Sequence, residues 1–215
     1  MNQHEIEYWE RYYAAHKQPF APSLFSKHVF HNYMSEGDSC IELGCGNGRD
    51  AVFFAENGID ITAYDQCAGE IGYLNRTYGK PGLKFLRADF TDLGTSAQYM
   101  HVYSRFTLHS ITEEGQAALL AWLAPSIAPG GYFHVEFRGL NNDLYALGQA
   151  VENQPNAYIY EDHYRRFICK EEFTTELERW GLEILNSVET KGFSPFNDTD
   201  EVFARITARK PASSY

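Results

Sequence analysis

The stretch Ile41-Glu42-Leu43-Gly44-Cys45-Gly46-Asn47-Gly48-Arg49 decides the fold. A short apolar run, typical of a buried strand, leads into a turn with glycine at every second position, and a helical pattern follows at once. Glycines at such a junction let the backbone approach a ligand closely, and the free N–H groups of a helix start can face a polar group. The stretch therefore predicts the site of a nucleotide-like cofactor.

The glycine spacing distinguishes between two kinds of cofactor. A dinucleotide-binding turn has the pattern G-x-G-x-x-G, whereas here Gly44 and Gly46 are followed by Gly48 and then Arg49. This spacing disfavours a nicotinamide-dependent oxidoreductase. Glu42-x-Gly44-x-Gly46-x-Gly48 instead resembles the first motif, E/D-x-G-x-G-x-G, of the class I S-adenosylmethionine-dependent methyltransferases. A tight strand-to-helix turn without a ligand is the alternative interpretation.

Alternation of apolar strands and helical patterns predicts an α/β fold. The expected strands are residues 38–43, 59–64, 83–88, 99–103, 132–137, 182–189 and 202–208. The last two form a close pair, so we expect a Rossmann-like, doubly wound, seven-stranded and mostly parallel sheet with an antiparallel C-terminal strand. The turn Pro129-Gly130-Gly131 and the strand after it resemble the same part of the family.

Length and composition favour a single domain over residues 1–215. The resemblance implies that it is a methyltransferase domain with an N-terminal helical lid at about 1–36 and a substrate-side insertion at about 139–168. The formal net charge of -11 repels phosphate backbones and anionic lipid, so we expect a small-molecule substrate and neither nucleic acid nor membrane as partner. No apolar run reaches the roughly 18 residues of a membrane span, and the N-terminus lacks a secretory signal pattern. We expect a cytoplasmic monomer or homodimer.

The four cysteines show no C-x-x-C spacing and no histidine at ligand spacing beside them. We therefore expect reduced thiols and no metal site.

An acid at the end of the second strand is expected to bind the ribose of the cofactor. Asp65 follows Gly44 by 21 residues, the distance at which a strand–helix–strand unit brings a carboxylate to the next strand end. The resemblance implies that Asp89 and Phe90 contact the adenine. The expected cofactor contacts are Trp9, Tyr13, Glu42, Gly44, Cys45, Gly46, Arg49, Asp65, Gln66, Asp89, Phe90 and Ser104. A solvated acid at a strand end is the alternative interpretation of Asp65.

Aromatic residues near the N-terminus are candidates for a lid. Trp9, Tyr13 and Phe20 have the spacing W-x3-[aromatic]-x6-F, which resembles the N-terminal segment of the thiopurine methyltransferase group. That resemblance implies that these residues cover the cofactor and approach the substrate. A helix packed on the core explains the same pattern. Residues 200–210 are similar to the C-terminal hairpin of the tellurite-resistance-type methyltransferases.

Methyl transfer from a sulfonium requires alignment and, for a hydroxyl acceptor, a base. His109 and Glu136 stand at strand ends and are the candidate bases, and Arg105 joins them as a candidate catalytic residue. His109 could instead be a helix-entry histidine that bonds to backbone, and Glu136 could simply pair with Arg138. The loop Ser104–Thr107 lacks the [D/N]-P-P-[Y/F] motif common in methylation of amino groups.

Positive side chains in an acidic chain favour an anionic acceptor, such as an acid, a sugar or a phosphate derivative. The expected substrate contacts are Phe20, Arg138, His163, Tyr164, Arg165 and Arg166. One alternative is an apolar pocket, lined by Phe106, Tyr145, Tyr158 and Tyr160, that takes a thiol, selenium or tellurium nucleophile. Another is a methyltransferase-like protein that binds the cofactor without catalysis.

Overall fold

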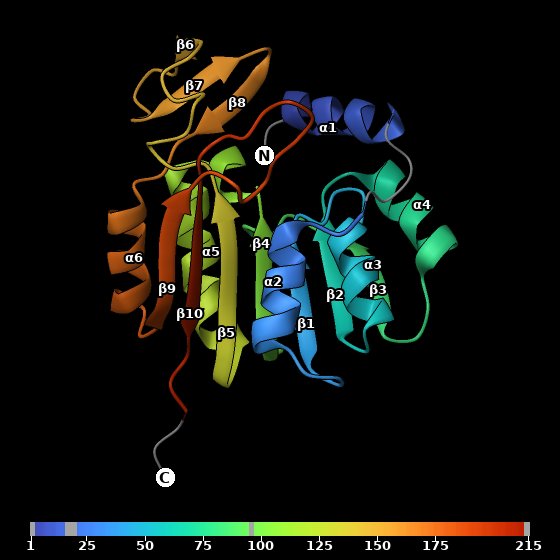
Figure 1. Ribbon diagram of the computed structural model, residues 1–215. Helices are drawn as coiled ribbons and strands as arrows, with labels where there is room; N and C mark the ends of the chain where they lie inside the picture. Colours follow the sequence, from blue (N-terminus) through green and yellow to red (C-terminus); the bar gives the residue numbers. More distant parts are fainter. Residues whose placement is uncertain (1–2, 16–20, 95–96, 213–215) are drawn as a thin grey trace.

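The computed structural model describes residues 3–15, 21–94 and 97–212. Within this part of the chain, the main sheet has seven strands in the order β3-β2-β1-β4-β5-β10-β9 (Figure 1). Their bounds are β1 Ser39–Leu43, β2 Asp60–Asp65, β3 Leu83–Arg87, β4 Tyr99–Arg105, β5 Ile127–Phe137, β9 Glu183–Thr190 and β10 Phe203–Arg209. Strands β1 to β5 pair in parallel, whereas β10 is antiparallel to both β5 and β9. The expected fold class is confirmed.

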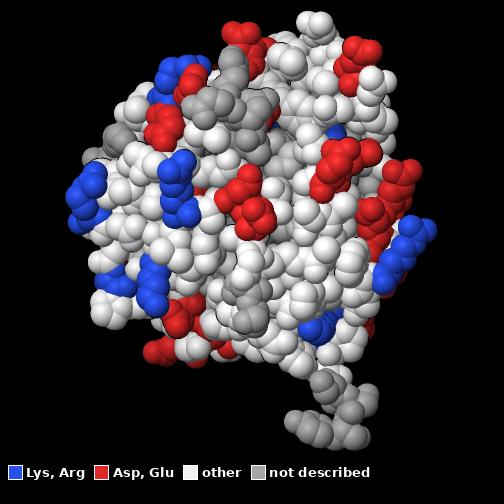
Figure 2. Space-filling view, turned by 180° about the vertical axis from the view of Figure 1, so that it is seen from behind, with Lys and Arg blue, Asp and Glu red and all other residues white. Residues whose placement is uncertain are grey.

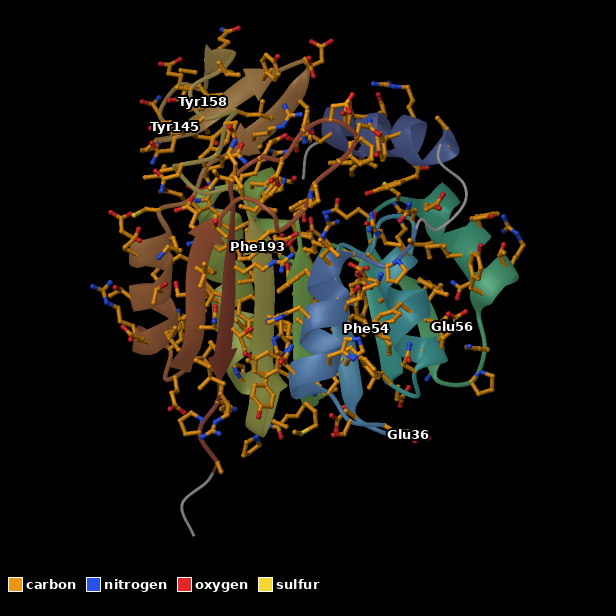
Figure 3. The ribbon with its side chains drawn as sticks, viewed as in Figure 1. Glu36, Phe54, Glu56, Tyr145, Tyr158 and Phe193 are labelled. Atoms are coloured by element: carbon orange, nitrogen blue, oxygen red, sulfur yellow. The ribbon has the colours of Figure 1, made fainter. Side chains whose placement is uncertain are left out.

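Helices cover both faces of this sheet, so its central strands are apolar on both sides. One face carries α2 (Leu24–Tyr33), α3 (Arg49–Glu56) and α4 (Ala68–Tyr78), and the other carries α5 (Glu113–Ser126) and α6 (Lys170–Arg179) (Figure 1). Phe54 points from α3 into the first layer and is fully buried (Figure 3). Leu123 and Phe173 fill the second layer.

Strand β1 marks the point where the winding of the sheet reverses. The chain runs from β1 through β2 to β3 in one direction and then continues with β4 on the other side of β1. Loops after β1 and β4 therefore diverge at the carboxyl ends of neighbouring strands. Ligands of open α/β sheets bind at this place.

The insertion after β5 forms a small antiparallel sheet above the carboxyl ends of the main strands (Figure 1). Its strands are β6 (Gln149–Ala150), β7 (Ala157–Tyr160) and β8 (His163–Arg166). The N-terminal helix α1 (Gln3–Ala15) contacts β8 and α4 and so spans the same end of the sheet. Both additions are positioned to enclose a ligand at the switch point.

Among the described residues, no helix combines the length and apolar character needed to cross a bilayer. On the face shown in Figure 2, the Lys and Arg side chains lie as separate groups among carboxylates. Acids gather in the first turns of α5 and α6 on this side of the sheet, at Glu113, Glu114, Glu171 and Glu172.

Candidate functional site

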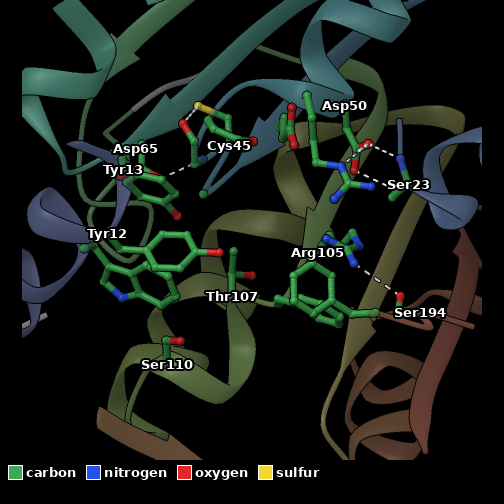
Figure 4. A pocket seen from close by; sticks show the side chains of 18 of the residues that line it. Tyr12, Tyr13, Ser23, Cys45, Asp50, Asp65, Arg105, Thr107, Ser110 and Ser194 are labelled. Atoms are coloured by element: carbon green, nitrogen blue, oxygen red, sulfur yellow. Dashed lines mark hydrogen bonds and ion pairs between the residues drawn. The ribbon is translucent and has the colours of Figure 1, made fainter. Parts of the chain in front are cut away.

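A cavity of about 800 Å³ lies at the carboxyl ends of β1, β2 and β4 (Figure 4). Helix α1 covers one side of it, and the start of α2 and the hairpin loop between β9 and β10 form the other. Its size is that of ordinary cofactor and substrate sites. The polar and aromatic residues lining it include Trp9, Tyr12, Tyr13, Ser23, Lys27, Glu42, Arg49, Asp50, Asp65, Gln66, Phe90, Arg105, Phe106, Arg138, Ser194 and Phe203.

The glycine-rich turn after β1 forms the floor of this cavity. Gly44, Gly46 and Gly48 have φ angles of 70°, 53° and 75°, which side-chain-bearing residues rarely adopt. A β-carbon at Gly44 would lie 2.3 Å from Thr107 Cγ2, and one at Gly46 would lie 2.7 Å from the hydroxyl oxygen of Tyr13. The glycines are therefore required both by backbone conformation and by the closeness of the opposite wall.

Asp65 joins the ends of β1 and β2. Its Oδ2 accepts a hydrogen bond from the Gly46 N–H at 2.9 Å, and its Oδ1 accepts one from the Cys67 N–H at 3.0 Å (Figure 4). Burial raises the pKa of Asp65, while these backbone donors oppose the shift. The carboxylate remains half-buried at the cavity wall, so it can accept further hydrogen bonds from a ligand.

Two other lining residues have polar atoms without a partner. Glu42 Oε2 and Gln66 Nε2 are buried and make no hydrogen bond with any described residue. Burial raises the pKa of Glu42 well above its usual value, and the nearby Asp50 carboxylate raises it further. Unpaired buried polar atoms are costly. A ligand with an ammonium or hydroxyl group and an acceptor group would satisfy both atoms.

The expected adenine contacts divide into two kinds. Phe90 lines the cavity and is 3% exposed. Asp89 does not belong to the described lining, and its Oδ1 accepts hydrogen bonds from the backbone N–H and the hydroxyl of Thr91. Ser104 is also outside the lining and hydrogen-bonds the hydroxyl of Thr107.

Helix α1 presents Trp9, Tyr12 and Tyr13 to the cavity. Trp9 and Tyr13 stack with ring centroids 5.6 Å apart. Tyr8 of the same helix stacks on His163 of β8, with ring centroids 4.7 Å apart. The helix thus connects the cavity to the small sheet, as a cover would. Phe20, expected here, lies outside the described residues.

Arg105 is fixed at the cavity wall by Glu136 of β5. Its Nε donates to Glu136 Oε1 at 3.0 Å and its Nη2 donates to Ser194 Oγ at 3.2 Å, while Nη1 makes no hydrogen bond with a described residue. Burial opposes the charge of Arg105, but the Glu136 and Asp50 carboxylates outweigh this effect and raise its pKa. The result is a permanently charged donor directed by its neighbours.

Glu136 does not have the geometry of a general base. It is fully buried, its Oε1 also accepts from Ser194 at 2.8 Å, and its Oε2 accepts from Arg205 Nε at 2.5 Å. Both oxygens are occupied, and the residue lies outside the described lining of the cavity. Its partners are Arg105 and Arg205, whereas the sequence had suggested Arg138.

His109 is likewise turned away from the described lining. Its Nδ1 accepts a hydrogen bond from the backbone N–H of Arg138 at 3.4 Å. Burial lowers the pKa of His109 well below its usual value, and the Arg138 guanidinium lowers it further. The position corresponds to the alternative interpretation, a helix-entry histidine bonded to backbone.

The expected cluster of substrate-binding residues separates in the structure. Arg138 lines the cavity, where it forms an ion pair with Glu201 and donates to Asn142 Oδ1 at 2.9 Å. Burial lowers the pKa of Arg138 to about 10. His163, Tyr164, Arg165 and Arg166 belong to β8 and lie outside the described lining.

Three polar residues of β8 make hydrogen bonds within the insertion or to α5 and the turn before it. Arg166 is buried and donates to the Ile111 carbonyl at 3.0 Å and to Gln116 Oε1 at 2.6 Å. Tyr164 donates to Gln154, and Arg165 donates to the carbonyl of Tyr160, both at 2.8 Å. These contacts hold the small sheet together and attach it to α5.

The aromatic residues proposed for an apolar pocket are not assembled either. Tyr145 and Tyr158 meet edge to face in the insertion, at 5.8 Å, and both pack against Phe167 (Figure 3). Of the proposed set, only Phe106 is in the described lining.

Asp50 is a lining residue that the sequence did not reveal. Its carboxylate accepts hydrogen bonds from the backbone and hydroxyl of Ser23, from Ser26 and from the hydroxyl of Tyr103, each at 2.8 Å (Figure 4). This network fixes the starts of α2 and α3 against β4. Its position in the first turn of α3, directly after the glycine turn, was the available signal.

The hairpin loop between β9 and β10 is the other missed part of the site. Ser194, Pro195, Phe196, Thr199 and Glu201 all line the cavity. The resemblance of residues 200–210 to a C-terminal hairpin did not indicate that the loop lines the cavity, because its place depends on the antiparallel pairing of β9 with β10.

Residues 40–131 match a family model described as a methyltransferase domain. A protein of Haemophilus influenzae, described as a probable S-adenosyl-L-methionine-dependent methyltransferase TehB, is 26% identical over 94 residues, which cover 43% of this chain and 33% of that protein. The aligned segment thus spans about a third of the relative.

Solved structures share the fold over most of the chain. A S-adenosylmethionine-dependent methyltransferase from Methanosarcina mazei has a TM-score of 0.73 at 17% identity, covering 86% of this chain and 98% of that one. A TehB-like methyltransferase from Corynebacterium glutamicum has a TM-score of 0.65 at 19% identity, and the match covers 96% of this chain and 98% of that one. An N1-methyltransferase from Burkholderia thailandensis was solved with 1,6-didemethyltoxoflavin and S-adenosylhomocysteine bound. It has a TM-score of 0.66 at 19% identity, and the match covers 86% of this chain and 76% of that one.

The expected resemblance to class I S-adenosylmethionine-dependent methyltransferases is confirmed. Residues 40–131, which match the methyltransferase-domain model, contain the glycine turn and Asp65. These findings support an enzyme of this class that uses S-adenosylmethionine as its cofactor.

Proposed function

We propose that this protein transfers the methyl group of S-adenosylmethionine to a small acceptor that carries an anionic group. The observation that supports the cofactor site most strongly is the contact between Asp65 and the Gly46 N–H at the junction of β1 and β2. It places a carboxylate beside a turn whose glycines carry no side chains of their own. In this arrangement the Asp65 carboxylate can accept hydrogen bonds from the two ribose hydroxyls of the cofactor, while the amino-acid portion of the cofactor packs against the glycine turn.

The residues present fit this cofactor. The unpaired Glu42 Oε2 can accept from the ammonium of the cofactor, and Gln66 Nε2 can donate to one of its oxygens. Phe90 supplies an apolar surface for the adenine, and Trp9 and Tyr13 cover the turn from above. When bound, the cofactor supplies an electrophilic methyl group, and the enclosing aromatics exclude water from it.

Arginine side chains support an anionic acceptor. Arg105 and Arg138 reach the cavity from the ends of β4 and β5. Arg105 lies on the side of the cavity away from Asp65 (Figure 4). Arg105 and Arg205 share the single carboxylate of Glu136, so this group of three retains one positive charge. Guanidinium groups bind carboxylate and phosphate with two parallel hydrogen bonds. The free Nη1 of Arg105 can therefore orient an acceptor toward the methyl group.

This chain contributes alignment rather than proton abstraction in this proposal. Glu136 has both oxygens occupied, and His109 accepts a backbone hydrogen bond and has a strongly lowered pKa. An acceptor that is already ionised needs no base. Alignment of the attacking atom can account for several kcal/mol of the barrier.

A thermal-shift screen of acidic metabolites, sugar phosphates and neutral thiols, with S-adenosylhomocysteine present, tests the acceptor class. Anions should dominate among the stabilising compounds, and Arg105→Gln should abolish their effect while S-adenosylhomocysteine still binds. Arg165→Gln is the matched control, since Arg165 lies outside the described lining and should leave the anions unaffected. Stabilisation by neutral thiols alone, unchanged in Arg105→Gln, would favour the soft-nucleophile alternative.

A further inference from the structure

Two large apolar side chains are exposed at the rim of the cavity. Leu24 is 48% exposed and Phe196 is 62% exposed, and both belong to the cavity lining. Leu24 begins α2, whereas Phe196 lies in the hairpin loop between β9 and β10. Two separate parts of the chain therefore bring apolar surface to the same opening.

A tight turn holds the backbone at Phe196. The Phe196 N–H donates to the Thr199 carbonyl at 2.9 Å, and the Thr199 N–H donates back to the Phe196 carbonyl at 3.0 Å. The Thr199 hydroxyl also donates to the Phe196 carbonyl at 2.7 Å. These bonds hold the backbone of Phe196, whose side chain is exposed at the rim.

The start of α2 is equally fixed. Ser23 caps the helix by accepting from the Ser26 N–H at 2.9 Å, and its own backbone N–H and hydroxyl are bound by Asp50. Leu24 follows directly, so its position at the rim is determined by this network.

Arg205 connects the two sides of the rim. Its guanidinium carbon lies 5.0 Å from the ring centre of Phe25 and 4.0 Å from that of Phe193. Phe25 follows Leu24 in α2, and Phe193 is in the same loop as Phe196 (Figure 3). A single cation therefore holds both apolar segments near the opening.

Farther inside, the acceptor side of the cavity combines apolar surface with charge. The rings of Phe106 and Phe203 lie 4.7 Å apart, with the Arg105 guanidinium 3.9 Å from Phe106 and the Arg138 guanidinium 4.9 Å from Phe203. Phe203 is 3% exposed, in contrast with the rim residues. Apolar side chains therefore line the cavity both beside the inner arginines and at its exposed rim.

We propose that the acceptor is an amphipathic acid, with its anionic group bound by Arg105 and an apolar portion that extends past Phe106 to the rim formed by Leu24 and Phe196. This inference rests on the proposed function and specifies the substrate class of the same site. A fully polar sugar phosphate would leave the rim exposed to water. An alkyl or aryl portion of the acceptor would cover it.

The test compares acids of different apolar length. Butyrate and octanoate are titrated by calorimetry into the full-length protein saturated with S-adenosylhomocysteine, whose binding is measured first. Octanoate should bind at least about tenfold more tightly than butyrate, because each additional buried methylene strengthens binding. Equal affinities, or no measurable binding of octanoate, would overturn the proposal.

Substitutions at the rim test whether Leu24 and Phe196 cause the preference for the longer acid. Phe196→Ser and Leu24→Ser should each reduce the preference for octanoate severalfold and leave butyrate binding unchanged. Leu185→Ser is the control, because Leu185 is 41% exposed on β9 and lies outside the described lining. An unchanged preference in both rim variants would contradict the proposal. Failure of S-adenosylhomocysteine to bind the wild-type protein would instead contradict the proposed function itself.

Discussion

Replacement of Asp65 by alanine tests how the cofactor site is built. The change removes a carboxylate that accepts the Gly46 N–H at 2.9 Å and the Cys67 N–H at 3.0 Å. Two consequences follow. The glycine turn loses the acceptor that fixes its position, and the ribose hydroxyls lose their expected partner.

The magnitude follows from these two contacts. Hydrogen bonds to charged groups contribute about 1.5 to 3 kcal/mol each. Asp65 is half-buried, so water replaces part of what is lost, and we expect the free energy of unfolding to fall by about 1 to 3 kcal/mol. Loss of the ribose contacts should weaken cofactor binding by at least about tenfold, equivalent to about 1.4 kcal/mol.

Calorimetric titration with S-adenosylhomocysteine measures the binding effect, and urea denaturation measures stability. Asp60→Ala is the matched control, because Asp60 is an exposed acid at the opposite end of the same strand. It should leave cofactor affinity unchanged. An Asp65→Ala protein that is folded and binds S-adenosylhomocysteine with wild-type affinity would refute this account of the site.

Gly44→Ala should lower the free energy of unfolding by about 1 to 3 kcal/mol, because a methyl group there overlaps Thr107 and strains the backbone. Gly130→Ala is the control and should cost less, since Gly130 also has a positive φ but has open surroundings. Equal urea denaturation midpoints for the two variants would contradict this prediction. Trp9→Ala should weaken the binding of S-adenosylhomocysteine measured by calorimetry. Trp180→Ala should leave this binding unchanged, because Trp180 is exposed at the end of α6. Equal affinities of the two variants would mean that α1 is a packing element only. Burial lowers the pKa of His134 well below its usual value, so the unfolded chain takes up a proton near pH 6.5 that the folded chain does not. The free energy of unfolding therefore decreases as pH falls through about 6.5. Between pH 7.5 and 5.5, the His134→Gln variant should lose less of this free energy than the wild type, as measured by urea denaturation. An equal loss in both proteins would contradict the lowered pKa of His134.

Local patterns predicted the parts of the site that depend on residues close in sequence. The glycine turn and Asp65 belong to one strand–helix–strand unit, whose geometry fixes their relation. The sheet followed from apolar strands that alternate with helices. These features need no knowledge of distant contacts.

The remaining parts depend on contacts between distant residues, which sequence patterns do not specify. Asp50 bonds to Tyr103, 53 residues later, and Glu136 bonds to Arg205, 69 residues later. Arg166 has the chemistry of an anion site, yet tertiary packing directs its donors to a backbone carbonyl and a glutamine. Residue type alone could not distinguish it from Arg105, which lines the cavity.

A crystal structure of the protein with S-adenosylhomocysteine tests the central claim most directly. The account predicts that the cofactor product lies in the cavity at the ends of β1 and β2, with its ribose hydroxyls bound by Asp65 and its amino-acid portion against Gly44 and Gly46. The sulfur should face the side of the cavity that carries Arg105. A complex in which the ligand binds elsewhere, or in which Asp65 makes no contact with the ribose, would contradict it.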